Sequence, residues 1–207
     1  VEDPDAWVET DDLFFTVQGE RWPYHDHAYL MLHKPSGTEC SQKASLYPSI
    51  YTLLPSPLRQ RGGGAAAGVQ AVGRLDQDTT GLLILSDDGK FIHRLTSPKH
   101  HVPKVYEVTT KHPLDASQIE RLVAGVVLDD DPKPVAAHAA VQTGTHNLTL
   151  TLTQGKYHQV KRMLAAVSNR VEGLHRSQIG SLTLADLPEG AWRWLTPDEV
   201  KQVSAKT

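Results

Sequence analysis

Leucine and threonine alternate with a strict period of two over residues 148–153. Such alternation predicts a strand with one buried face. Residues 82–85 are instead four consecutive apolar residues, which indicates a buried strand. Short apolar or alternating segments predict seven strands, at 13–17, 28–32, 69–72, 82–85, 105–109, 134–143 and 147–153. The last two segments are expected to pair, and the strand at 28–32 is expected to stop at His33-Lys34-Pro35, because proline cannot continue a central ladder.

Three helices are predicted between these strands, at about 88–95, 115–124 and 158–168. Asp88 and Asp115 stand where their side chains can cap the first two helices. Serine followed by proline ends the first helix, and glycine ends the second. Strands and helices are interspersed without a regular βαβ order. The pattern therefore predicts an α+β fold with a mixed, largely antiparallel sheet.

A chain of 207 residues with 39% hydrophobic residues is typical of a single globular domain. No apolar run approaches the roughly 18–20 residues that a membrane span requires, so we expect no membrane association. The single cysteine, Cys40, excludes an internal disulfide and favours a cytoplasmic location. Residues 55–68, which include a glycine- and alanine-rich stretch at 62–68, are expected to form a surface loop.

The net charge of −3 hides a strong segregation of charges. Residues 1–20 contain seven acidic residues and no lysine or arginine, which leaves 17 acidic and 21 basic residues in the remainder. Residues 89–106 contain no acid, and residues 132–185 contain six lysines and arginines against one acid. Such clustering is typical either of a face that binds a polyanion such as RNA or of ordinary solvated loops, and both interpretations stay open on charge alone.

The densest group of reactive side chains is in Gly73–Gly81, a loop between two predicted strands. It contains Arg74, Asp76 and Asp78. In an extended loop these three side chains point the same way, since they are two residues apart. A carboxylate beside a cation stays ionised, which suits a nucleophile. The alternative is a turn whose side chains only satisfy their own backbone.

A second cluster begins the helix expected at 158–168. His158, Lys161 and Arg162 are spaced three and four residues apart, so a helix would place them on one basic face. That face could hold a phosphate or carboxylate, or could simply be solvated. A metal site is not expected, because the adjacent His100 and His101 would point to opposite sides of an extended chain.

Four ordered motifs resemble the RsuA/RluB/RluE/RluF family of pseudouridine synthases and together cover about residues 28–200. The first combines Gly73-Arg74-Leu75-Asp76 with Thr79–Leu85 and Asp87-Asp88-Gly89. The others are Lys104–Val108, Gly155–Met163, and Leu174-His175-Arg176 with Ile179-Gly180. The variant at 157–163 is more similar to the RsuA branch, which acts on small-subunit ribosomal RNA, than to the RluB, RluE and RluF branch.

The resemblance implies that the chain isomerises a specific uridine of small-subunit (16S) ribosomal RNA to pseudouridine, on a base flipped out of its stack. It assigns the nucleophilic carboxylate to Asp76, the tyrosine packed on the uracil to Tyr106 and the basic partner of the aspartate to Lys161. It also implies that Arg74 contacts the flipped nucleotide or its phosphates. RNA-binding roles are further expected for the basic residues Lys104, His158, Arg162 and Arg176. No metal or organic cofactor is expected, and family habit favours a monomer.

The same resemblance divides the chain into residues 1–24, expected to be the last part of an S4-like RNA-binding domain with its linker, and a catalytic domain over residues 25–207. The chain departs from the family in His33, where asparagine usually precedes Lys-Pro, and in the inserted 62–68 segment. Three alternatives stay open: a synthase of the RluB, RluE and RluF type acting on large-subunit RNA, a non-catalytic RNA-binding module, and a glycoside or nucleoside hydrolase that uses Asp76 and Asp78.

Overall fold

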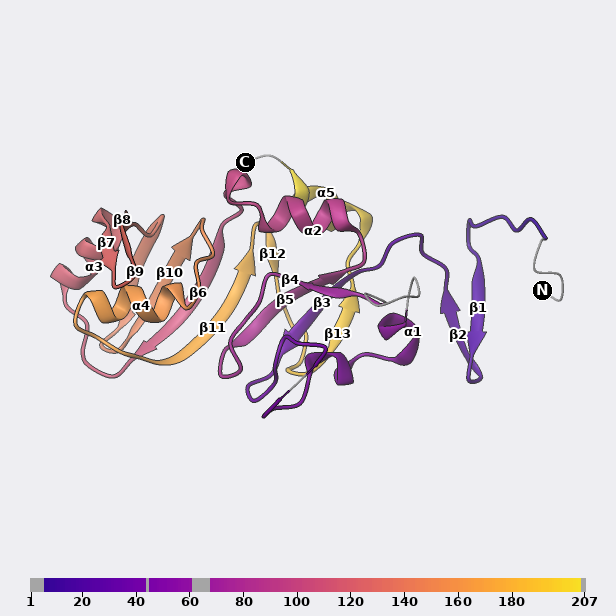
Figure 1. Cartoon of the computed structure of the whole chain (residues 1–207), viewed down its shortest axis with the longest axis horizontal. Helices are drawn as coiled ribbons and strands as arrows, with labels where there is room; N and C mark the ends of the chain where they lie inside the picture. Colours follow the sequence, from indigo (N-terminus) through magenta and orange to yellow (C-terminus); the bar gives the residue numbers. More distant parts are fainter. Residues whose placement is uncertain (1–5, 44, 61–67, 206–207) are drawn as a thin grey trace.

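Nine strands form one large sheet in our computed structural model, which describes residues 6–43, 45–60 and 68–205 (Figure 1). Its strands follow the order β13-β3-β5-β11-β6-β10-β9, with β4 added beside β5 and β12 beside β11. Their bounds are β3 Tyr29–Lys34, β4 Gln70–Val72, β5 Thr80–Ser86, β6 Lys104–Thr110, β9 Ala139–Gly144, β10 Asn147–Leu152, β11 Val171–Ile179, β12 Leu182–Thr183 and β13 Trp192–Trp194.

The pairings in this sheet are antiparallel except that between β5 and β11, which is parallel. The α+β prediction with a mixed, largely antiparallel sheet is therefore confirmed. The parallel contact is short and matches His175 with Thr80 and Arg176 with Gly81. It joins two antiparallel halves of the sheet, one that ends at β5 and one that begins at β11 (Figure 1).

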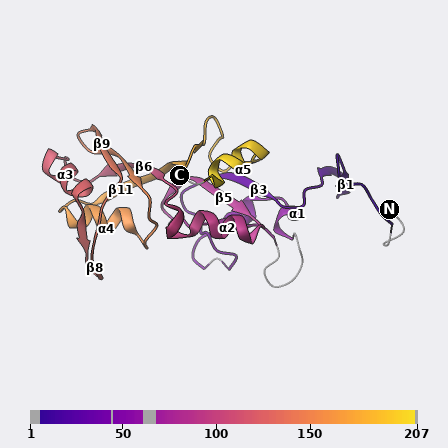
Figure 2. The ribbon, with the colours of Figure 1, turned by 90° about the horizontal axis from the view of Figure 1, so that it is seen from above.

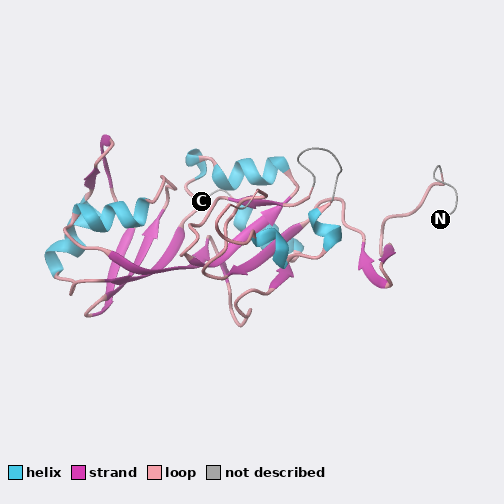
Figure 3. Ribbon diagram, turned by 60° about the horizontal axis from the view of Figure 1, so that its bottom comes forward, coloured by secondary structure: helices cyan, strands magenta, loops and turns pink. Residues whose placement is uncertain are grey.

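Helices cover the sheet, and their bounds are α1 Ser56–Arg59, α2 Gly89–Thr96, α3 Ala116–Ala124, α4 Gln159–Ala166 and α5 Pro197–Ser204. Helices α2 and α4 lie on the same side of the sheet, one over each half (Figures 2 and 3). Asp88 caps α2 and Asp115 caps α3 through a reciprocal capping box, as the sequence predicts. None of the described helices is long and apolar enough to cross a membrane.

Two small hairpins lie outside the large sheet. Strands β1 (Phe14–Val17) and β2 (Glu20–Pro23) pair only with each other, near the N-terminal end in Figure 1. Strands β7 (Val126–Leu128) and β8 (Asp131–Val135) form the second hairpin, beside α4. The turn of this hairpin carries two acidic residues, Asp129 and Asp130.

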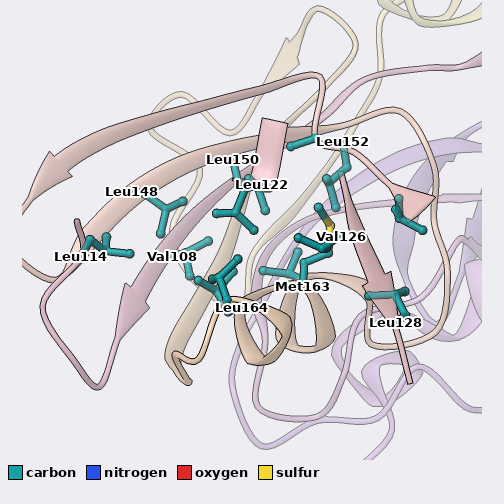
Figure 4. Packing of buried hydrophobic residues seen from close by; sticks show 14 residues of the cluster. Val108, Leu114, Leu122, Val126, Leu128, Leu148, Leu150, Leu152, Met163 and Leu164 are labelled. Atoms are coloured by element: carbon teal, nitrogen blue, oxygen red, sulfur yellow. The ribbon is translucent and has the colours of Figure 1, made fainter. Parts of the chain in front are cut away.

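The alternating segment 148–153 buries its leucines on one face of the sheet, whereas the apolar segment 82–85 is buried on both faces. Leu148, Leu150 and Leu152 all enter one core between the sheet and helices α3 and α4, together with Val108, Met163 and Leu164 (Figure 4). In β5, by contrast, Leu82 and Ile84 enter a core shared with α2 and α5, while Leu83 and Leu85 enter a third core on the opposite face. The half of the sheet that contains β5 is therefore buried on both faces.

Three sequence predictions need correction. The strand expected at 134–143 is two strands, because Ala137, between β8 and β9, donates its backbone N–H to Leu122 of α3 and not to a neighbouring strand. Strand β3 does not stop at His33 but continues through Lys34, and only Pro35 ends it. The helix expected at 158–168 is shorter, at 159–166. Half of the surface loop predicted at 55–68, residues 61–67, lies outside the described residues, and α1 occupies its first part.

Candidate functional site

The site is centred on Asp76, in the loop that leads into β5. The Asp76 carboxylate lies between two basic side chains from the beginning of α4. Its Oδ1 is 3.1 Å from Nε2 of His158, and its Oδ2 is 3.0 Å from Nζ of Lys161. The three side chains are each about one-third exposed, so the cluster is open enough for a ligand to reach and buried enough for its charges to interact strongly.

Lys161 also contacts the second carboxylate of the loop, since its Nζ donates to both oxygens of Asp78, at 2.8 and 3.1 Å. Burial lowers the pKa of Lys161, but the hydrogen bonds to Asp78 and Asp76 outweigh that effect and hold the pKa above its usual value of 10.5. Burial alone raises the pKa of Asp78, yet the hydrogen bond from Lys161 brings the pKa below its usual value. Lys161 is thus a fixed cation between two carboxylates.

His158 reaches Asp76 from an unusual backbone conformation. It precedes α4 with a φ of 47°, in the left-handed region, so it does not lie on the helical face that the sequence predicts. The ring of Tyr157 stacks on the His158 ring with centroids 3.7 Å apart, and Tyr157 itself is 76% exposed. This stack presents an aromatic surface directly beside Asp76.

Arg162 does not contact Asp76, unlike His158 and Lys161, with which it is expected to share a face. Its guanidinium donates to Asp129 and Asp130 in the β7–β8 turn and to the backbone oxygen of Tyr157. The expected single basic face of His158, Lys161 and Arg162 is therefore wrong. Arg162 instead ties the acidic hairpin turn to α4, while its expected role in RNA binding stays a prediction.

A buried lysine anchors the loop that carries Asp76. The Lys34 side chain has no exposed surface, and its Nζ donates to the backbone oxygens of Pro35, Gln77 and Thr79 at 3.0, 3.3 and 2.9 Å. Burial lowers the pKa of Lys34 below its usual value. Two of these carbonyls belong to the loop segment that follows Asp76, and the third follows β3, so Lys34 ties the loop to the end of β3 and limits the direction of the Asp76 side chain. Sequence reasoning did not identify this role, because it ended the strand at residue 32 and placed Lys34 beyond it.

Tyr106 stands on β6 opposite Arg176 of β11, and Arg176 in turn stands opposite Gly81 of β5. Tyr106, Arg176 and Gly81 are therefore neighbours across three adjacent strands, at the place where the two halves of the sheet meet. It lines a pocket of about 430 Å³, partly open to solvent, together with Arg74, Asp76, His158 and Lys161. The structure thus brings the predicted nucleophile, tyrosine and lysine together with Arg74. Asp78 does not line this pocket.

Lys104 and Arg176 lie in a neighbouring cavity that shares Arg74, Tyr106 and Lys156 with the first. Arg176 is only 4% exposed and therefore is not part of a surface patch, while its expected role in RNA binding stays a prediction. His33, the departure from the family pattern, places Nδ1 at 2.8 Å from the backbone oxygen of Leu187 and packs edge-on against His175. His33 therefore links β3 to the segment before β13 and lies outside the linings of both cavities.

Comparison with known proteins places this geometry in a family. The RNA pseudouridylate synthase family pattern matches residues 28–166. The ribosomal small subunit pseudouridine synthase A of Pasteurella multocida is 41% identical over 194 residues, which cover 93% of this chain and 80% of that protein. The protein of the same name from Vibrio cholerae is 41% identical over 188 residues, or 90% of this chain and 78% of that protein.

A solved structure described as a pseudouridylate synthase superposes with a TM-score of 0.78 at 37% identity, covering 98% of this chain and 85% of that chain. The chain therefore belongs to the RNA pseudouridylate synthase family and is an isomerase of that class. The resemblance inferred from the four motifs, including the closer similarity to the RsuA branch, is confirmed.

Proposed function

We propose that this chain converts a specific uridine of small-subunit (16S) ribosomal RNA into pseudouridine, with Asp76 as the nucleophile. The observation that carries the proposal is the position of the Asp76 carboxylate, held between His158 and Lys161 in the wall of a pocket that Tyr106 also lines. The names of the relatives and the Tyr157-His158-Gln159 variant support the small-subunit substrate. Its action on ribosomal RNA places the protein in the cytoplasm, with ribosome assembly as its process.

The reaction requires no oxidant and no imported group. The bond between N1 of uracil and C1′ of ribose breaks, a bond between C5 and C1′ forms, C5 loses a proton and N1 gains one. An oxygen of Asp76 attacks the nucleotide, at the sugar or at the uracil ring, and leaves again when the new bond forms. The ion pair with Lys161 holds this oxygen in place, since the Lys161 ammonium is itself fixed from two sides by Asp76 and Asp78.

Tyr106 packs against the uracil, and its hydroxyl assists removal of the proton from C5. Arg74, which is exposed at the pocket entrance, contacts the flipped nucleotide. The Tyr157–His158 stack offers a flat surface on which an unpaired base can lie. Taking the base out of its stack costs a few kcal/mol, so a uridine in a loop is a better substrate than one in a duplex.

A hydrolase with two catalytic carboxylates is less well supported. Such an enzyme needs both carboxylates on the same substrate bond. Asp76 lines the pocket, whereas Asp78 is 53% exposed at its side chain and lies outside the pocket lining. The second carboxylate therefore acts on Lys161 and not on a substrate.

We further propose that residues 25–207 are the catalytic domain and that residues 1–24 are the last part of an S4-like domain with its linker. The β1–β2 hairpin, which forms a sheet of its own, supports this division. Trp22 of the hairpin packs against the core that contains β3 and β5, which would link the two parts. The catalytic domain is expected to act as a monomer, as the family resemblance implies.

The substrate is tested by tritium release from ribosomal RNA labelled with 5-[³H]uridine, because loss of the C5 proton releases the label. Small-subunit and large-subunit RNA, each with bound ribosomal proteins, are compared under the same conditions. Release from small-subunit RNA alone is expected. Release from large-subunit RNA alone would place the enzyme with the RluB, RluE and RluF type, and no release from either RNA by folded protein would contradict the proposed activity.

A further inference from the structure

The cavity beside the Asp76 pocket is strongly basic. It encloses about 1130 Å³ between side chains, part of it open to solvent, and its lining includes Arg74, Lys104, Lys156 and Arg176 but no aspartate or glutamate. Lys156 is already paired with Asp131 of the β7–β8 hairpin. The remaining cations therefore share a concave surface without a carboxylate in its wall.

Arg176 is buried in the wall of this cavity, and part of its guanidinium has no hydrogen-bond partner in the residues that the structure describes. Its Nε donates to the backbone oxygen of Leu82 at 2.8 Å, and its Nη2 is buried without a partner among the described residues. Within the described part of the chain no carboxylate lies within ion-pair distance of its guanidinium. Buried guanidinium groups normally have a partner for each donor, but the described residues leave Nη2 of Arg176 unpaired.

Lys104 adds a second cation to the same wall. Its side chain has no ion pair with any described carboxylate. Burial and, to a smaller extent, repulsion from Arg176 together lower the pKa of Lys104 to about 8. Two like charges that face one cavity and repel each other would both be stabilised by an anion between them.

We propose that Lys104 and Arg176 form a subsite for one backbone phosphate of the substrate RNA, next to the uridine held at Asp76. The inference rests on the proposed function for the identity of the anion. The two cavities share Arg74, Tyr106 and Lys156, so a nucleotide in one places its phosphate within reach of the other. A phosphodiester has several acceptor oxygens, which can take hydrogen bonds from a guanidinium and an ammonium at once.

The position of the subsite gives it a specific role. Arg176 lies between Gly81, at the beginning of β5, and Tyr106 on β6. A phosphate bound there fixes the sugar of the target nucleotide relative to both Asp76 and Tyr106. Lys104 and Arg176 would thus bind the RNA at a point that orients the base, whereas exposed lysines elsewhere contribute only to general attraction.

The test compares the binding of uridine, uridine 5′-monophosphate and uridine 3′-monophosphate to the wild-type chain and to Lys104→Met by calorimetry. One of the two monophosphates is expected to bind at least about tenfold more tightly than uridine, and this preference should fall to about one in Lys104→Met. Lys201→Met, which removes an exposed lysine on α5, is the matched control and should keep the preference. Arg176→Lys keeps the charge and should retain part of it.

Inorganic phosphate provides a second readout that needs no uridine. Titration of the Lys104 ε-carbon by NMR, assigned with Lys104→Met, should give a higher pKa for Lys104 when phosphate is present. On RNA, Lys104→Met should raise KM much more than it lowers kcat and should reduce the salt slope of binding by about one.

The outcomes separate this inference from the proposed function. If uridine binds but neither phosphate increases affinity, or if the increase survives in Lys104→Met, the subsite is refuted and the proposed function stands. If no uridine compound binds more tightly than inorganic phosphate, while phosphate still raises the pKa of Lys104, the anion subsite stands and the proposed substrate fails.

Discussion

Gly81, where β5 pairs with β11, provides a test of how the site is assembled. Its φ is +115°, and a Cβ added there would lie within 3.0 Å of the backbone N, C and O of Arg176. The positive φ costs a residue with a side chain about 1–2 kcal/mol, and overpacking against a backbone that cannot turn away adds about 1–3 kcal/mol. Gly81→Ala is therefore expected to lower the free energy of unfolding by about 2–5 kcal/mol.

Two other glycines of the signature motifs separate these contributions. Gly73 has a φ of +74° with nothing within 4 Å of an added Cβ, whereas Gly155 has neither a positive φ nor a close neighbour. Gly73→Ala should thus lower the free energy of unfolding by only the cost of the positive φ, about 1–2 kcal/mol. Gly155→Ala should leave the free energy of unfolding almost unchanged. At about 2–4 °C per kcal/mol for a chain of this size, Tm should fall by roughly 10 °C for Gly81→Ala and by a few degrees for Gly73→Ala.

Thermal and urea unfolding of the three variants, followed by circular dichroism, measure this series. The order Gly81, Gly73, Gly155, from most to least destabilised, is the result that the geometry requires. An equal Tm for Gly81→Ala and Gly155→Ala would refute the close approach of β5 and β11, and with it the position of Arg176 beside the catalytic loop.

Three further results are expected. Lys161→Met should lower kcat at least about tenfold, because it leaves the Asp76 carboxylate without its ammonium partner, and Lys161→Arg should recover part of the loss; equal rates for all three proteins would contradict the pairing. Tyr106→Phe should bind RNA normally but turn over more slowly, and an unchanged kcat in single-turnover assays would reduce Tyr106 to packing. The pKa of Glu199 is lowered to about 2, first by the hydrogen bond from Arg193, so stability present above pH 4.5 should be lost as the pH falls toward 2. Glu199→Gln should remove about 1–2 kcal/mol at neutral pH and little at pH 2, and a constant difference across this range in urea unfolding would count against that ion pair.

The features that could be predicted from the sequence are those with a local cause. The alternation of Leu148, Leu150 and Leu152 gives β10, and the reciprocal cap at Asp115 gives α3, because neighbours in sequence suffice for both. The signature motifs also indicate that Asp76 and Lys161 meet. That ion pair, 3.0 Å long, joins residues 85 positions apart, and only the family resemblance pointed to it.

Other features depend on tertiary contacts that leave little trace in the sequence. Strand β11 has no apolar alternation, because most of its residues are half-buried at the junction of the two halves of the sheet. The left-handed backbone of His158 and the three carbonyls around Lys34 are likewise set by partners far away in the chain. Arg176 looks like one more surface cation in the sequence, and only the fold buries it.

The central claim, that Asp76 is the nucleophile, is tested most directly by tritium release from 5-[³H]uridine-labelled small-subunit RNA with bound ribosomal proteins. Wild type, Asp76→Asn and Asp78→Asn are compared. The two substitutions remove the same charge from the same partner, Lys161, but only Asp76 lines the pocket. Release by wild type and, more slowly, by Asp78→Asn, with none by folded Asp76→Asn, is the expected result. Release by Asp76→Asn at a rate near that of wild type would contradict the account.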